Sequence, residues 1–164
     1  MGDGRTSFDV TGEPLKTQLE TFIDEYRAAL PACLDGLTEE QARRSLVPSA
    51  TTLLGLVKHV TYVERVWFGE AVTGRSRQEM GLPPTAADAF ILAADDTIGS
   101  VRQAHAAACE ASRQATAGLG LDDTLRGHRL GPLPLRWVYL QVLRELAQHC
   151  GHADILREQI LSAG

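Results

Sequence analysis

Three polar side chains interrupt an otherwise apolar row near the carboxyl end of the chain. The row advances in steps of three and four residues, the spacing of one face of an α-helix. Its members are Leu135, Val138, Val142, Glu145, His149, His152, Leu156 and Ile160. Burying a carboxylate and two imidazoles without partners costs several kcal/mol. The middle of the row therefore either faces water or holds something that satisfies these groups.

A divalent metal ion would satisfy them. Glu145 and His149 are four residues apart, and His152 follows three residues later, so their side chains neighbour one another on a helix. A further ligand is expected from another helix, and His59 is the candidate because it borders the apolar residues Leu56, Val63 and Val66. We predict one metal ion held by His59, Glu145 and His149, with open positions typical of a catalytic site.

The donor set does not select one metal. Two imidazoles and a carboxylate suit zinc, nickel, iron or manganese, and affinity order alone does not separate them. We place zinc and nickel ahead of iron and manganese. The spacing also leaves open whether Glu145 or His152 completes the site.

Two other interpretations stay open. A single histidine beside an apolar row is more often a hydrogen-bonded core residue than a ligand, so the chain could be a purely structural bundle whose polar row faces water. A non-catalytic protein that binds a small molecule in the same cleft, such as a resistance protein, would carry the same residues.

Helical spacing recurs in four long segments and predicts an all-α four-helix bundle. The predicted helices cover residues 15–30, 52–72, 85–116 and 134–161, with a short helix at 39–45 between the first two. Thr38 and Gln41 form a capping box at the start of that short helix. We predict a single domain over residues 1–164, in which residues 1–13 form a loose arm.

Composition limits the class of protein. The 164 residues are 44% hydrophobic and carry a net charge of −5, which is typical of a globular domain and unlike a basic nucleic-acid-binding protein. No run approaches the length of a membrane span. Three cysteines without a Cys-x-x-Cys pair favour a reduced, cytoplasmic setting. The expected partners are small molecules, and a homodimer through a helix face is compatible with the sequence.

The remaining conspicuous residues receive less specific predictions. Tyr62, one turn after His59, is predicted to line the cleft and contact the cosubstrate. We expect Trp67 and Trp137 to pack in the bundle and His105 to be exposed. His128 in the loop at 118–134 is also expected to be exposed, and Arg126, His128 and Arg129 are candidates to contact an anionic substrate.

Four stretches carry a resemblance to a known family. They are LLGLVKHV at 53–60, VERVWF at 63–68, LRWV at 135–138 and ELAQHCGHADILRE at 145–158. On these motifs the chain resembles the DinB-like metal-dependent bundle superfamily, in its DUF664 (mini-circle protein) branch. The resemblance implies a four-helix bundle with an unusual order of helix directions. It also implies one metal ligand from the second helix, matched by His59, and two from the last, matched by Glu145 and His149.

The resemblance also implies an activity. Relatives include thiol S-transferases and isomerases that use mycothiol or bacillithiol. We therefore expect a metal-dependent thiol S-transferase or isomerase with mycothiol as cosubstrate and a small-molecule electrophile. In that chemistry the thiol reacts as a thiolate, and His152 is the candidate catalytic residue that moves a proton.

Overall fold

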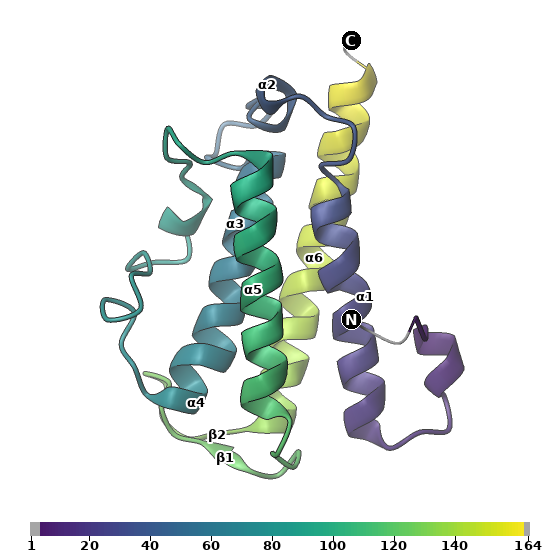
Figure 1. Cartoon of the computed structure of the whole chain (residues 1–164), viewed down its shortest axis with the longest axis vertical. Coiled ribbons are helices and arrows are strands. Elements are labelled where there is room, and N and C mark those ends of the chain that lie inside the picture. Colours follow the sequence, from purple (N-terminus) through teal and green to yellow (C-terminus); the bar gives the residue numbers. More distant parts are fainter. Residues whose placement is uncertain (1–3, 163–164) are drawn as a thin grey trace.

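Four long helices form the structure, a computed structural model that describes residues 4–162 (Figure 1). They are α1 (Leu15–Ala32), α3 (Leu53–Glu64), α5 (Ile98–Thr116) and α6 (Leu135–Ser162). The shorter elements are α2 (Glu39–Ala42), a π-helical segment (Arg65–Glu70), α4 (Ala71–Thr73) and the paired strands β1 (Thr124–Leu125) and β2 (Leu133–Pro134). The prediction of an all-α four-helix bundle is confirmed.

The order of helix directions decides how the bundle is built. α1 and α6 run in one direction, and α3 and α5 run in the other (Figure 1). α1 packs against α6, while α3 packs against both α5 and α6. Because α3 and α5 are neighbours that run parallel, the chain must return along the bundle before α5 begins. Residues 74–97 make this return, and we call them the crossover.

The third long helix begins later than the sequence predicted. It starts at Ile98 rather than Thr85, and the preceding residues form a loop with one 3-10 turn, Asp88–Phe90. Thr97 caps the helix by accepting a hydrogen bond from the Ser100 amide. The Asp96 carboxylate accepts hydrogen bonds from Lys58 Nζ and the Ala93 amide. These contacts to α3 and within the crossover override the helix propensity of the alanine-rich sequence.

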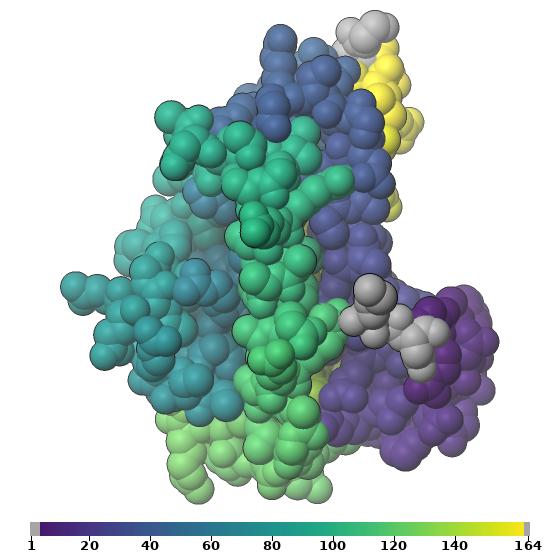
Figure 2. All heavy atoms as spheres, in the orientation of Figure 1, coloured from purple at the N-terminus to yellow at the C-terminus, as the bar shows by residue number. Residues whose placement is uncertain are grey.

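Part of the predicted loose arm is ordered against the bundle. Ser7–Val10 forms a 3-10 turn whose Val10 side chain is fully buried. The Ser7 amide donates a hydrogen bond to Glu25 Oε1 on α1. Figure 2 shows this turn packed beside α1, and the crossover side chains forming a raised layer on the opposite flank. An apolar anchor thus attaches residues 7–10, while residues 1–3 lie outside the described residues.

The buried face of α6 differs at its centre from the predicted row. After Val142, the next fully covered side chains are Leu146 and Ala153 rather than the three polar residues. Glu145 and His149 lie half-buried at the edge of this face, and His152 is exposed. The helix therefore keeps an apolar core along its length and presents its polar residues beside it.

The length and hydropathy of the helices bear on the expectation that the chain has no membrane span. Among the described residues, no helix has both the length and the apolar character needed to cross a membrane.

His105 is buried, against the prediction that it is exposed. Its side chain on α5 is 2% exposed. Its Nε2 lies 3.2 Å from the carbonyl oxygen of Arg27, and its Nδ1 lies 3.4 Å from Thr61 Oγ1. Beside it, Arg27 donates two hydrogen bonds to the buried Glu64 carboxylate. His105 thus occupies a polar layer between α1, α3 and α5, which residue spacing on α5 alone does not reveal.

Gly55 tests how closely the crossover packs on α3. Alanine inside a helix normally adds up to about 1 kcal/mol of stability over glycine. A Cβ at Gly55 would instead lie 2.7 Å from the carbonyl oxygen of Phe90. We expect Gly55→Ala to lower the free energy of unfolding by about 1–3 kcal/mol, measured by urea denaturation.

Gly99→Ala is the matched control for this substitution. Its Cβ would meet only Thr97 Oγ1, at 3.8 Å. We expect stability equal to or above that of the wild type. Equal stability of the two variants would show that the crossover does not pack tightly on α3.

Burial of His105 predicts a pH dependence of stability. Burial lowers the pKa of His105 below its ordinary value of about 6.5. The unfolded chain therefore binds a proton that the folded chain does not, and stability falls as the pH drops below about 6.5. We expect His105→Gln to reduce the slope of unfolding free energy against pH between about pH 7 and pH 5. The exposed, non-titrating Gln148→Ala should keep the wild-type slope, and a wild-type slope in His105→Gln would refute the prediction.

Candidate metal centre

His59 lies in the middle of α3 and is covered by the crossover. Its side chain is 4% exposed, and the Phe90 ring stacks on its imidazole with centroids 4.0 Å apart. Its Nδ1 lies 3.0 Å from the carbonyl oxygen of Ala86. Because a carbonyl only accepts, Nδ1 carries the proton and Nε2 keeps its lone pair. The crossover thus determines which nitrogen of His59 can bind a cation.

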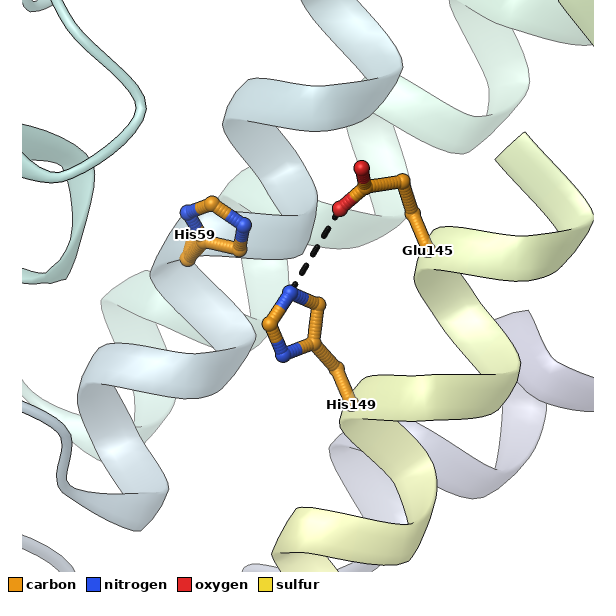
Figure 3. Close-up of side chains that lie close together, drawn as sticks. All are labelled: His59, Glu145 and His149. Carbon is orange, nitrogen blue, oxygen red and sulfur yellow. Dashed lines mark ion pairs between the residues drawn. The ribbon is translucent and has the colours of Figure 1, made fainter. Parts of the chain in front are cut away.

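Glu145 and His149 face His59 from α6 (Figure 3). His149 Nε2 lies 3.5 Å from Glu145 Oε2, and the rings of His59 and His149 meet edge to face with centroids 4.6 Å apart. One donor atom from each of the three residues lies within 4.8 Å of the others. The antiparallel packing of α3 and α6 therefore brings together residues that are 86 or more positions apart in sequence.

The ionisation states of His59 and Glu145 suit a cation. Burial lowers the pKa of His59 to about 4, and the neighbouring His149 adds to this effect. A hydrogen bond from His149 holds the pKa of Glu145 below its ordinary value. Near neutral pH, His59 is therefore a neutral imidazole and Glu145 a carboxylate, which are the forms that coordinate metal ions.

Neighbouring groups orient two of these donors. The Ala86 carbonyl holds the His59 ring, and Gln141 Nε2 donates a hydrogen bond of 2.9 Å to Glu145 Oε1. Metal-binding histidines and carboxylates in proteins commonly have such outer partners. Two imidazoles and one carboxylate are a donor set that fits a divalent transition metal with open coordination positions.

His152 and Tyr62 lie beside this group rather than in it. His152 is exposed, and its Nδ1 lies 3.4 Å from His149 Nδ1, on the side of that ring opposite Glu145. Tyr62 is buried, with its ring centroid 6.3 Å from that of His59. Its hydroxyl accepts a hydrogen bond of 2.7 Å from Arg77 in the crossover. The geometry therefore groups Glu145, not His152, with the two histidines.

The tryptophans and His128 form a second aromatic group where α6 begins. Trp67 stacks on His128 with centroids 4.4 Å apart and meets Trp137 at 5.6 Å. His128 is 5% exposed, so the prediction of an exposed His128 is wrong, because the loop folds its ring onto Trp67. Arg126 and Arg129 in the same loop are exposed. Trp137 keeps 40% of its surface exposed.

Comparison with known families decides where the chain belongs. The family model described as mycothiol-S-transferase matches residues 18–161. This match includes His59, Glu145 and His149 and spans nearly the whole chain. The protein is a member of the mycothiol-S-transferase family. That family is DinB-like, which confirms the resemblance recognised in the sequence. No curated protein is a significant match to the chain.

Family membership does not by itself identify the residues that complete the site. In this mycothiol-S-transferase family member, four residues contact His59, Tyr62 or Glu145 in ways that the sequence did not suggest. They are Ala86, Phe90, Arg77 and Gln141. Gln141 had a usable signal, since it lies one helical turn before Glu145. Ala86 and Phe90 had none, because only the path of the crossover brings them to His59.

Proposed function

We propose that this protein is a metal-dependent mycothiol S-transferase whose divalent cation is held by His59, Glu145 and His149. The observation that supports it most is the convergence of these three donors from α3 and α6 in a member of this family. Zinc or nickel is the preferred ion, with iron or manganese next. We also infer membership of the DUF664 branch and a cytoplasmic setting, and a homodimer stays a prediction.

The bound cation would lower the pKa of the thiol and hold it as the nucleophilic thiolate. The chain's own residues prepare the site for that chemistry. The Ala86 carbonyl keeps the proton of His59 on Nδ1, and Phe90 excludes water from the buried face of the ring. Glu145 adds a negative charge beside His59 and His149 and stays partly exposed, so the thiol can approach from the side of α6.

His152 is the group that we assign to proton transfer. It is exposed, and its Nδ1 faces Nδ1 of His149 across 3.4 Å. A histidine in contact with solvent near neutral pH can accept a proton released by the thiol and pass it on. The thiolate sulfur then forms a bond to carbon of the electrophile, which either loses a leaving group (transfer) or re-expels the thiol after rearrangement (isomerisation).

Thiol consumption tests this proposal. We expect metal-loaded protein to consume mycothiol with members of a panel of small electrophiles, and the chelator-treated protein to be inactive. Glu145→Gln should lower the rate by more than about 100-fold, because outer partners of a metal alone cost about 10–100-fold. The exposed neighbour Gln148→Ala should retain the wild-type rate.

Two outcomes would contradict catalysis. Equal rates with and without metal across a broad panel would remove the proposed role of the cation. Loss of one electrophile per protein molecule without turnover would instead support the alternative, a small-molecule-binding protein that uses the same residues.

A further inference from the structure

A row of α6 side chains leads from the candidate metal centre to the aromatic group. His149, Glu145, Gln141 and Trp137 follow one another at intervals of four residues, and we call them the α6 row. Residues at this interval form a continuous ridge on a helix. Each step advances about 6 Å along the axis, so Trp137 lies about 12 Å from Glu145.

Both ends of the α6 row meet α3 or its π-helical continuation. At one end, His149 meets His59 with ring centroids 4.6 Å apart, and at the other, Trp137 meets Trp67 at 5.6 Å. Between them, Gln141 donates a hydrogen bond to Glu145. Both ends of the row therefore contact the helix formed by α3 and its π-helical continuation, while the row turns about 40° around α6 at each step.

The aromatic end of the α6 row is packed against neighbouring rings and is partly exposed to solvent. His128 is buried and stacks on Trp67 with ring planes only 16° apart, so its imidazole packs flat against one face of the indole. Trp137 nevertheless keeps 40% of its surface exposed. An exposed tryptophan supported by packed rings offers a flat apolar face, which suits the C–H face of a sugar ring.

We propose that Trp137, with Trp67, binds the sugar portion of the thiol cosubstrate. The inference rests on the proposed function, because it takes mycothiol as the thiol. Mycothiol carries its cysteine on a pseudodisaccharide of glucosamine and inositol. With the sulfur at the three donor residues, two linked six-membered rings extend along the α6 row and reach Trp137. Trp137 is then a specificity-determining residue that favours this thiol over smaller ones.

The test is binding of the pseudodisaccharide alone, without its cysteine, to the full-length metal-loaded protein. Both tryptophans of the chain lie in this aromatic group, so intrinsic tryptophan fluorescence reports on it alone. We expect a saturable change in emission, confirmed by calorimetry. Trp137→Ala should raise the Kd by about tenfold or more, as for an interface anchor, with Trp67 as the remaining reporter.

Two further variants make the test specific. Trp137→Phe keeps an aromatic face and should recover part of the affinity. Ile155→Ala removes an exposed apolar side chain from α6 about 27 Å along the axis from Trp137 and should bind as the wild type does. In the transfer assay, Trp137→Ala should raise KM for mycothiol and leave the rate with N-acetylcysteine, which lacks the sugars, unchanged.

The outcomes separate this inference from the proposed function. If the pseudodisaccharide does not bind, or binds equally to Trp137→Ala, the inference is overturned even where mycothiol is consumed. If it binds through Trp137 but no thiol is consumed, the inference holds and the transfer activity fails.

Discussion

The parallel arrangement of α3 and α5 is the constraint on which the candidate site depends. Because these neighbours run in the same direction, residues 74–97 must return along the bundle. That return places the Phe90 ring and the Ala86 carbonyl on His59. The same stretch therefore buries His59, which lowers its pKa, and the Ala86 carbonyl determines which nitrogen is free. A bundle with a short α3–α5 connection would leave this histidine uncovered.

The candidate site also requires that its polar side chains on α6 do not disrupt the apolar core of the bundle. Leu146 and Ala153 occupy the buried centre of α6, while Glu145 and His149 lie at its edge. Glu145 therefore keeps contact with water and a hydrogen bond from Gln141, which reduces the cost of placing a carboxylate beside α3. The polar row is compatible with a stable bundle because it lies beside the apolar face and not within it.

Sequence reasoning found the residues whose contacts follow from helical spacing. Glu145 and His149 are neighbours on any helix, and His59 borders an apolar row on another. Helical spacing did not predict features that depend on contacts between residues distant in sequence. Thr85 to Thr97 has the composition of a helix, but Thr97 and Asp96 end the crossover through specific contacts. His105 and His128 are buried because partners distant in sequence, Arg27 and Trp67, cover them.

The metal content of the purified protein shows whether His59, Glu145 and His149 bind a cation. The protein is stripped with chelator, re-equilibrated separately with zinc, nickel, iron and manganese, desalted and measured by inductively coupled plasma mass spectrometry. We expect one equivalent of at least one of these metals in the wild type and in Gln148→Ala, and almost none in His59→Ala or His149→Ala. No bound metal in the wild type under any of these conditions, or a full equivalent retained by both histidine variants, would contradict this expectation.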